Sequence, residues 1–594
     1  MKSLFKSILC ELYWRKDYLH TIKHYPGRLK QITVYLYVHF FTIGTFMYIL
    51  NTFEESLRTY IQNGFGADPF IEGKAECTLN TDESKQEFGD ISTNVAMILA
   101  QQLKRNPRDI AAIIQKEFHH PTIARIEVAG PGFLNIFLTE QIFQVLAEQL
   151  YMRKQTFFKA CESHIRERVS LEFVSANPTG PLHFGHGRGG IIGDVLANVM
   201  TFVGHTVTKE YYINDAGLQI IKLGISLKVR CQQACGLDVQ LPEEGYAGDY
   251  LIDLAQQCIQ EYGVAVLSEK DTFFQEYAKE KLLLQIKKTL TDYGITFDVW
   301  FSEKRLHIDG AIEATLHLLE AKGYLYRKEG ALWFKSTDFG DDKDRVMKKS
   351  SGELTYVAAD AAYLRNKAER GFDRCIIVLG YDHHGYVQRL AGLRQALGIP
   401  FRFDAILYQL VKIKSEGKQV RMSKRAGAIV TLDQVIEQVG AEVARFFYVN
   451  RKADAQLEFD LDLAMTKTEE NPVYYIQYAY VRIKSIFAKA KEQFPSVELG
   501  DIQYVSSPDD RLMLKKIIAL KPLLLHMSQS YQTHLLSYYT IELAQAFHRY
   551  YGKYKILDPL QEAQSRGRLL LLQLLEQNFE LCMQLLGIER LEKM

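Results

Sequence analysis

The stretch between residues 169 and 200 constrains the fold of this chain more than any other part of the sequence. An apolar run typical of a buried strand, 169–174 (VSLEFV), leads into a turn rich in Gly, Pro and His, and a helical pattern continues from Gly190 to Met200. Open α/β sheets bind phosphate at such strand–turn–helix elements, because the first helical amides and the helix dipole favour an anion. The stretch therefore predicts a parallel sheet with a ligand site at the carboxyl ends of its strands.

Strand and helix patterns alternate along residues 165–465. Residues 206–213 and 374–379 are further strands, and the second of these is apolar and ends at Gly380. Apolar strands that alternate with helices favour a Rossmann-like, doubly wound parallel sheet. Between about 225 and 300 the pattern becomes helical and polar, which we interpret as a helical insertion in this domain.

Two smaller domains are predicted on either side. In residues 47–150, the strands 124–128 and 133–138 are joined by the turn Gly130-Pro131-Gly132, and a helical stretch at 93–118 breaks at Pro107, which indicates a small α+β domain. Residues 466–594 are helical throughout, with a clear helix start at 507–510 (SPDD) and a Leu-rich helix at 569–586. The expected fold is therefore an α/β catalytic domain between an α+β N-terminal domain and an all-α C-terminal helix bundle.

The first fifty residues do not fit this plan. Residues 32–50 carry no acidic or basic side chain except His39, and Lys23, Arg28 and Lys30 precede them. This is long enough to span a bilayer, but Thr and Gly interrupt the segment and it has no small-residue cleavage site. We interpret Met47 as the true start of the protein and residues 1–46 as upstream translation or a dispensable extension, and a membrane-anchored protein is the alternative. Native peptides from before Met47 would contradict a start at Met47.

Composition narrows the expected partners and cofactors. The formal net charge is +1, so contact with nucleic acid requires a local basic surface. The eight Cys form no Cys-x-x-Cys pair, and no second pair or His cluster completes a zinc site around Cys231 and Cys235. We expect no zinc or other protein-bound metal, and thiols that stay reduced in the cytoplasm.

The turn at 175–190 (SANPTGPLHFGHGRGG) carries candidate catalytic residues. His183 and His186 stand three positions apart, and each can donate a hydrogen bond to an oxygen that gains charge as an α-phosphate is attacked. Gly185 between them permits close approach of a ligand to the backbone. A Gly-rich turn with ordinary histidines is the alternative, and the motif alone does not decide between the two.

A second motif, 421–427 (RMSKRAG), lies more than two hundred residues downstream. Three cations in five positions, followed by Gly, predict a loop that closes over a triphosphate, where Lys424 would neutralise the β- and γ-phosphates as pyrophosphate leaves. A short basic run is usually only a solvated face. The pairing with His-x-Gly-His in one α/β domain is what makes this motif specific.

Together the two motifs resemble the HIGH and KMSKS signatures of class I aminoacyl-tRNA synthetases. Further stretches narrow the resemblance to arginyl-tRNA synthetases of the bacterial type, from about Met47 to the C-terminus. They are 172–183 (EFVSANPTGPLH), 211–217 (YYINDAG), 298–303 (DVWFSE), 380–386 (GYDHHGY) and 471–478 (NPVYYIQY), with 88–90 (FGD) and 129–135 (AGPGFLN) in the N-terminal domain.

The resemblance implies where ATP binds. In this family the nucleotide lies along the first motif and under the loop of the second. The positions that match here are Pro181, Gly185, Gly187, Met422 and Ser423.

The resemblance also implies an arginine pocket. Asn177 is expected to contact the α-amino and carboxylate groups, and Tyr356 and Asp360 match the pair that holds the guanidinium. Their spacing would place them on one face of a helix, and a carboxylate can accept paired hydrogen bonds from a guanidinium. An ordinary surface Tyr–Asp pair is the alternative. One of Asp382 and His383 is expected to face the ligand, and His383 is our candidate.

Three positions depart from the family pattern. Arg421 replaces the first Lys of the second signature, which keeps the charge but changes the phosphate geometry. Tyr381 stands where Ala is usual, so we expect a different pocket wall. Phe184 replaces an aliphatic residue between the two histidines, a change that a helix entrance tolerates.

The activity implied by the resemblance is arginine–tRNA ligation. Arginine would attack the α-phosphate of ATP, supplied as its Mg²⁺ complex, and the arginyl-adenylate would then esterify the terminal ribose of tRNA. The expected enzyme is a cytoplasmic monomer without a membrane partner, whose helical domain holds the anticodon and whose N-terminal domain touches the outer corner of the tRNA. The alternatives are another class I synthetase, a small nucleotidylyltransferase, or a non-catalytic tRNA-binding paralogue that would have no use for His183, His186 and Lys424.

Overall fold

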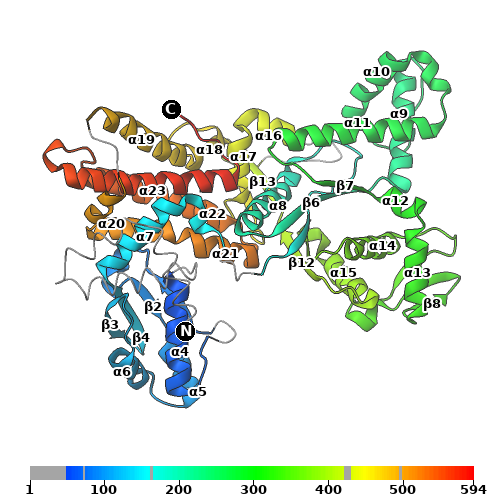
Figure 1. The fold of residues 1–594 in the computed structure, drawn as a ribbon. Coiled ribbons are helices and arrows are strands. Elements are labelled where there is room, and N and C mark those ends of the chain that lie inside the picture. The colour runs from blue at the N-terminus through cyan, green and yellow to red at the C-terminus, as the bar shows by residue number, and fades with distance from the viewer. Residues whose placement is uncertain (1–48, 71–73, 161–164, 420–429, 494–497, 594) are drawn as a thin grey trace, which may run out of the picture. The chain divides into compact units, whose positions relative to one another are not determined.

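The computed structural model describes residues 49–70, 74–160, 165–419, 430–493 and 498–593. These residues form two compact units (Figure 1). Unit 1 comprises the residues up to 149 together with 505–519, and unit 2 comprises 150–160, the residues from 165 to 504, and those from 520 onward.

Unit 1 is built on an antiparallel sheet in the order β1-β2-β4-β3. The two strands predicted in this region are confirmed as β3 and β4, and the turn between them places Gly130 and Gly132 at φ values of 50° and 132°, which favour glycine. The predicted helical stretch is confirmed as two helices that separate before Pro107. The elements are β1 (Cys77–Leu79), β2 (Ile91–Thr93), β3 (Ile123–Ala129), β4 (Phe133–Leu138), α4 (Ile49–Phe65), α5 (Val95–Leu103), α6 (Pro107–Glu117) and α7 (Glu140–Arg153).

One helix from late in the sequence belongs to the same unit. It is α20 (Pro508–Ile518), and its predicted start is confirmed: Ser507 Oγ accepts from the amide of Asp510 at 3.1 Å, and Asp510 Oδ2 accepts from the amide of Ser507 at 3.0 Å. The buried Lys515 Nζ lies 2.9 Å from Asp90 Oδ1, next to β2. This ion pair ties the helix to the N-terminal sheet.

Unit 2 is centred on a five-stranded sheet in the order β12-β11-β5-β6-β7, in which every pairing is parallel. The chain runs from β5 outward to β6 and β7 on one side and returns through β11 to β12 on the other, so the strand order reverses between β5 and β11. Ligands bind at such a switch point, beyond the carboxyl ends of the strands. The strands are β5 (Arg168–Glu172), β6 (Thr206–Ile213), β7 (Val299–Ser302), β11 (Arg374–Gly380) and β12 (Arg402–Tyr408).

The helix after β5 begins earlier than its sequence pattern predicts. It is α8 (Phe184–Val203), which starts six residues before Gly190. Its early glycines are helical because they pack closely against other elements. A Cβ at Gly187 would lie 2.9 Å from the side chains of Leu432 and Tyr448, and one at Gly189 would lie 2.7 Å from Tyr408. The prediction treated these glycines as part of the turn, whereas they allow close packing.

The predicted insertion is helical, and it projects from the sheet as a lobe (Figure 1). It contains α9 (Leu218–Ala234), α10 (Tyr250–Tyr262) and α11 (Asp271–Asp292), which share a core that includes Leu223, Leu227, Leu251 and Phe274. A separate core lies where α13, α14 and α15 pack together. The remaining elements before the helical region are α12 (Glu303–Ile308), α13 (Ala311–Ala321), β8 (Leu325–Lys328), β9 (Ala331–Phe334), β10 (Arg345–Lys348), α14 (Tyr356–Glu369), α15 (His384–Leu397), β13 (Val411–Ser415), β14 (Lys418–Gln419), α16 (Leu432–Val439), α17 (Ala441–Val449), β15 (Leu457–Asp460) and α18 (Leu461–Met465).

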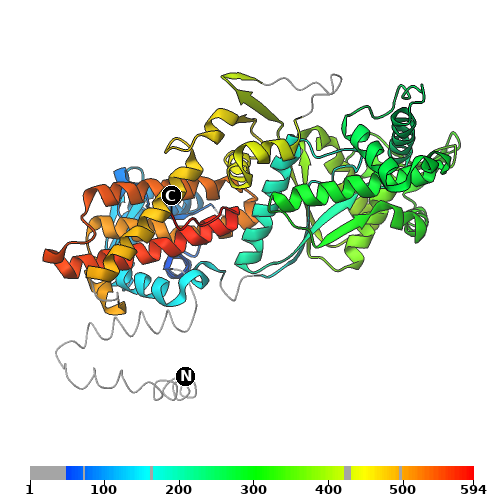
Figure 2. The ribbon, with the colours of Figure 1, turned by 90° about the horizontal axis from the view of Figure 1, so that it is seen from above.

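Helices of the C-terminal region complete unit 2 (Figure 2). The Leu-rich pattern at 569–586 is confirmed as the buried part of α23, whose side chains from Leu569 to Leu572 are fully buried. The helices are α19 (Pro472–Gln493), α21 (Leu520–Ser530), α22 (His534–Lys553) and α23 (Glu562–Leu586). No helix in the described ranges is both long and apolar enough to cross a membrane. The apolar segment 32–50 and the extension 1–46 lie outside those ranges, apart from the last two residues of the segment.

Candidate active site

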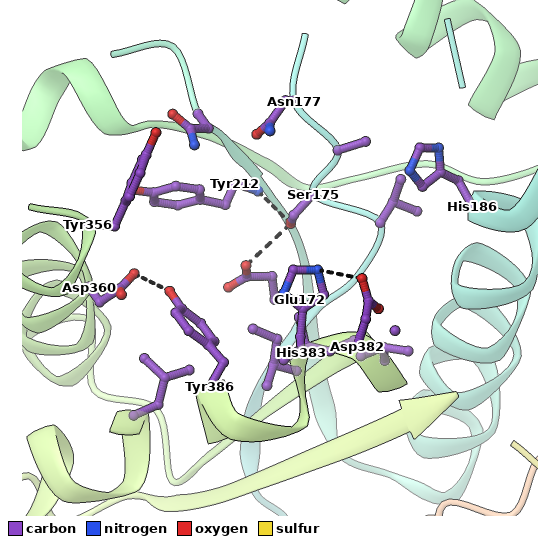
Figure 3. A pocket seen from close by; sticks show the side chains of 18 of the residues that line it. Glu172, Ser175, Asn177, His186, Tyr212, Tyr356, Asp360, Asp382, His383 and Tyr386 are labelled. Carbon is purple, nitrogen blue, oxygen red and sulfur yellow. Dashed lines mark hydrogen bonds and ion pairs between the residues drawn. The ribbon is translucent and has the colours of Figure 1, made fainter. Parts of the chain in front are cut away.

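A cavity of about 860 Å³ opens at the carboxyl ends of β5, β6 and β11, where the strand order reverses. Its volume suits a small molecule, since ligand pockets are commonly about 300–1,000 Å³. Figure 3 shows Tyr356 and Asp360 at one side and His186 at the other, with Ser175 and Asn177 between them. The cavity therefore joins the two parts of the site that the sequence predicted separately.

The turn after β5 has an unusual backbone. Val174 and Ser175 have φ values of 66° and 40°, in the left-handed region that a β-branched residue such as Val rarely adopts. Ser175 Oγ donates to Glu172 Oε1 at 3.3 Å and accepts from the amide of Tyr212 at 3.0 Å. These bonds hold a strained turn in place, as is common where a backbone must present functional groups.

Tyrosines fix the loop that follows. Tyr211, from β6, donates through its hydroxyl to Ala176 O at 2.7 Å, and Tyr250, from α10, donates to Thr179 O at 2.6 Å. Asn177 lies between these two anchors and lines the cavity. Its side chain is thus carried by a backbone that is held on both sides.

The two signature histidines meet at the start of α8. His183 is the residue before the helix, and both rings line the cavity. The rings stack with centroids 3.6 Å apart, and the amide of His183 donates to His186 Nδ1 at 3.2 Å. A neutral imidazole that accepts at Nδ1 carries its proton at Nε2, so this bond assigns the proton of a neutral His186 ring to Nε2.

Asp360 lies opposite, on the helix face predicted from the sequence. Helix α14 begins at Tyr356 and carries Asp360 one turn later. The hydroxyl of Tyr386 donates to Asp360 Oδ1, while Oδ2 is buried and has no hydrogen-bond partner in the described part of the chain. Burial raises the pKa of this carboxyl to about 7. Arg389, which also lines the cavity, opposes this rise but does not cancel it.

Further acidic groups face the same cavity. Glu172, at the end of β5, and Glu303, at the start of α12, both line it, and burial raises the pKa of Glu303. Neither was predicted as a site residue. Glu172 did give a signal, because a charged side chain inside an otherwise apolar strand requires a buried partner or a ligand.

A network of ion pairs borders the cavity, and Glu172, Tyr363 and Lys367 of this network line it. Lys367 Nζ donates to Glu172 Oε2 at 2.6 Å, and Arg370 donates to both carboxylate oxygens of Glu210 at 2.6 and 2.8 Å. Burial alone would raise the pKa of Glu210, but Lys367 and Arg370 outweigh it, so that this pKa is lowered. The hydroxyl of Tyr363 lies within hydrogen-bond distance of both glutamates and can donate its one proton to either. In contrast to Asp360, these acids therefore have their partners within the protein.

Only one of the other described residues that were predicted to contact the nucleotide lines the cavity. Gly185 lines the cavity, whereas Pro181 and Gly187 are not among the lining residues. Gly187 packs against Leu432 and Tyr448, so its role in the structure is close packing. The predicted residues Met422, Ser423 and Lys424, together with Arg421, lie outside the described residues.

The segment after β11 supplies two side chains at the floor of the cavity (Figure 3). Asp382 and His383 both line it, and His383 Nε2 lies 3.6 Å from Asp382 Oδ2. Tyr381 is not among the lining residues. Its ring stacks on His384 and is about half exposed. The expected change in the pocket wall at Tyr381 is therefore not seen. Among the described residues, no group of three or more His, Cys, Asp or Glu side chains could hold a metal ion.

Family models match the chain in three consecutive parts. Residues 51–138 match the arginyl tRNA synthetase N terminal domain, residues 146–458 match the catalytic domain of class I tRNA synthetases (R), and residues 476–594 match the DALR anticodon binding domain. The cavity and all of its lining residues fall within the catalytic match.

Curated relatives agree with these matches over nearly their whole length. The arginine–tRNA ligase of Oleidesulfovibrio alaskensis is 41% identical over 526 residues, covering 86% of this chain and 94% of that relative. The arginine–tRNA ligase of Bacillus subtilis is 40% identical over 517 residues, covering 85% of this chain and 92% of that relative.

Solved structures are similar in fold. An arginyl-tRNA synthetase crystal structure from Campylobacter jejuni matches with a TM-score of 0.71 at 33% identity, covering 77% of this chain and 100% of that chain. The arginyl-tRNA synthetase of Thermus thermophilus has the same TM-score at 20% identity, covering 92% and 100%. With the family models and the curated relatives, these matches show that the chain belongs to the arginyl-tRNA synthetase family of class I aminoacyl-tRNA synthetases.

Proposed function

We propose that this cavity binds arginine with its guanidinium at Asp360 and activates it with ATP for transfer to tRNA. The observation that carries the proposal is the buried Asp360 Oδ2, which has no partner in the described part of the chain. A buried carboxylate oxygen without a hydrogen-bond donor is costly, and a guanidinium provides both a charge and two N–H donors. Tyr356, one turn earlier on α14, borders the same end of the cavity and can cover the planar group.

The other end of arginine would lie toward α8. Asn177 can contact the α-amino and carboxylate groups, since its loop is held by Tyr211 and Tyr250. His383 is the candidate for a second contact from the cavity floor, with Asp382 as its neighbour. This orientation directs the arginine carboxylate toward His183 and His186.

ATP, as its Mg²⁺ complex, would place its α-phosphate at the start of α8. The helix amides and His186 can stabilise the charge that develops on the phosphate oxygens. Gly185 leaves room beside the backbone, because a Cβ there would lie 3.0 Å from the ring of His183. Pro181, Met422 and Ser423 remain sequence-based candidates for nucleotide contacts, and Lys424 remains the candidate clamp on the β- and γ-phosphates.

The chemistry follows in two balanced steps. A carboxylate oxygen of arginine forms a bond to the α-phosphorus, and the bond to the β-phosphate oxygen breaks, so that pyrophosphate leaves with the electron pair. The 2′ hydroxyl of the terminal tRNA ribose then attacks the adenylate carbonyl and loses its proton, and AMP leaves. Neither step requires covalent participation of the protein, so positioning and electrostatics supply the catalysis.

The tRNA would be held by the flanking domains. The region that matches an anticodon-binding domain is the candidate for the anticodon, and the N-terminal domain is the candidate for the outer corner of the tRNA. Cytoplasmic ATP and tRNA suit a cytoplasmic enzyme. We propose a monomer, as the resemblance to the family implies.

Pyrophosphate exchange into ATP, measured with each amino acid in turn and with or without total bacterial tRNA, tests the proposal. Exchange only with arginine, and only when tRNA is present, is the expected result. Exchange with a different amino acid would retain the class I chemistry but overturn the assignment of Asp360. No exchange with any amino acid would favour a tRNA-binding protein without activity.

A further inference from the structure

The guanidinium of Arg445, on α17, is fully surrounded by polar partners from three other elements of unit 2. It donates to Asp194 Oδ2 of α8 at 2.6 Å, to Tyr293 O at 2.9 Å and to Leu586 O at 3.0 Å. Arg445 is only 3% exposed and Asp194 only 2% exposed. Each of the three guanidinium nitrogens has one defined acceptor, so the position of the buried guanidinium is fixed relative to all three elements.

Two of these acceptors are helix ends. Tyr293 is the residue that follows α11, and Leu586 is the last residue of α23. Carbonyl groups at helix C-termini lack intrahelical partners and carry partial negative charge, which a buried cation satisfies. The turn after α23 lies directly against the guanidinium: a Cβ at Gly587 would come within 2.4 Å of Arg445 Nε. Glycine is required at this position both by that contact and by its φ of 72°.

Asp194, the acid on α8, also interacts with Asn198 and Lys209. Asn198 Nδ2 and Lys209 Nζ each lie 3.4 Å from Asp194, and Asn198 Nδ2 also donates to Leu585 O at 3.2 Å. Two consecutive carbonyls at the end of α23 are therefore held, one by α8 through Asn198 and one by α17 through Arg445. The end of α23 and the middle of α8 are consequently fixed to each other.

This connection leads along α8 to the signature histidines. Asp194 is eight residues after His186 on the same helix, a separation of about 12 Å at 1.5 Å per residue. A helix shifts as one rigid element, so a movement at Asp194 carries His183 and His186 with it. Catalytic groups tolerate only about 0.5 Å of displacement, and about 1 Å can cost a hundredfold in rate.

We propose that Arg445 is a positioning residue for the reaction. It fixes α8, and thereby His183 and His186, to the ends of α11 and α23, and α23 belongs to the region that matches the anticodon-binding domain. The proposal rests on the function proposed above. It assigns to Arg445 an effect on turnover that a merely stabilising buried arginine lacks.

Arg374 provides the matched control. It is as buried as Arg445 and ion-pairs with Glu167, and it donates to Ser528 O, the end of α21, at 3.4 Å and to the hydroxyl of Tyr531 at 3.1 Å. Like Arg445 it joins the sheet domain to a C-terminal helix. However, it is the first residue of β11 and lies at the end of that strand away from the cavity.

The test compares Arg445→Met with Arg374→Met in the full-length protein, by thermal unfolding and by aminoacylation kinetics. Both variants should unfold at lower temperature. Only Arg445→Met should lower kcat, by about tenfold or more, while KM for arginine and ATP stays within about twofold. Arg445→Lys, which retains the charge but has fewer donors in a fixed plane, should recover part of the lost kcat.

Asp194→Asn approaches the same contact from α8 and decides the matter if Arg445→Met does not fold. It should show the same loss of kcat, and the double variant should lose no more than the larger single loss, because both remove one interaction. Unchanged kcat in Asp194→Asn, or an equal loss in Arg374→Met, would overturn the proposal. If the unmodified protein fails to charge tRNA with arginine, the proposed function fails instead, so the two failures are distinguishable.

Discussion

The hydroxyl of Tyr386 donates to one carboxylate oxygen of Asp360 and leaves the other buried without a partner in the described part of the chain. The tyrosine thus sets the direction of the carboxylate of Asp360, a residue that lines the cavity together with Tyr356 and Asn177. Recognition of a cation is consequently prepared before any ligand binds.

Asp360→Asn should weaken arginine recognition by about 1.5–3 kcal/mol, because a charge-assisted hydrogen bond is lost. The measurement is KM for arginine in tRNA charging, with KM for ATP as the internal control, since the nucleotide end of the cavity is unchanged. Unaltered arginine affinity in this variant would mean that the guanidinium binds elsewhere.

Arginine binding should depend on pH through the same residue. Burial raises the pKa of Asp360 from 3.8 to about 7 in the folded protein, so below pH 7 the empty site is mostly protonated. A bound guanidinium requires the ionised form. KM for arginine should therefore rise as pH falls through 7, by up to about tenfold per unit, and should level off above 7. Asp360→Asn should abolish this dependence, and a wild-type profile that stays flat between pH 6 and 8 would argue against an ionised Asp360 as the ligand.

The raised pKa of Asp360 also makes the stability of the folded protein depend on pH. Because the folded state holds the Asp360 proton more tightly than the unfolded chain does, this group's contribution to stability is fully present below pH 3.8 and is lost as pH rises through about 7. Bound arginine should offset this loss at pH 8. Thermal unfolding at pH 6 and pH 8, with and without arginine, measures the effect, and it should disappear in Asp360→Asn.

Lys424→Ala should reduce turnover by roughly a hundredfold or more while changing arginine affinity little, because a phosphate clamp acts as pyrophosphate leaves. Burst and steady-state measurements of adenylate formation separate these two quantities. A variant with the wild-type rate would show that the second signature is not the clamp, whatever its likeness to the family pattern.

Lys367→Met should destabilise unit 2 by about 3–5 kcal/mol, because it leaves the buried Glu172 without its 2.6 Å partner. Urea unfolding followed by the fluorescence of Trp300 and Trp333 provides the measurement. Lys349→Met is the control, since Lys349 and Glu353 form a pair in which both side chains are about half exposed. Equal losses of unfolding free energy in Lys367→Met and Lys349→Met would show that the buried ion network contributes no more to stability than the exposed pair.

Much of the fold could be predicted from local patterns. The strand 374–379 follows from a run of apolar residues that ends at Gly380, and the start of α20 follows from Ser507, Pro508 and Asp510, whose side chains act within four residues. Such features can be predicted because the residues that determine them are neighbours in the sequence.

What could not be predicted depends on partners that are distant in the sequence. Lys367 lies 195 positions from Glu172, so the sequence gives no indication that this acid is neutralised. Gly187 is a predicted nucleotide contact from its place in the motif, and its close packing against Leu432 and Tyr448 is visible only in the folded chain. Asp360 was identified through the family resemblance. Its unpartnered oxygen, which explains the choice of a carboxylate, is visible only in the folded chain.

In the function proposed above, helix α14 carries residues for substrate recognition and residues for structural support. Tyr356 and Asp360 line the cavity, and so do Tyr363 and Lys367, one and two turns further along, which complete the ion network with Glu172. A change of substrate to another amino acid would require new residues at the cavity end of this helix, while the residues that neutralise the two glutamates are kept. Few sequences of this helix satisfy both requirements, so the fold limits which amino acids a related enzyme could bind at this site.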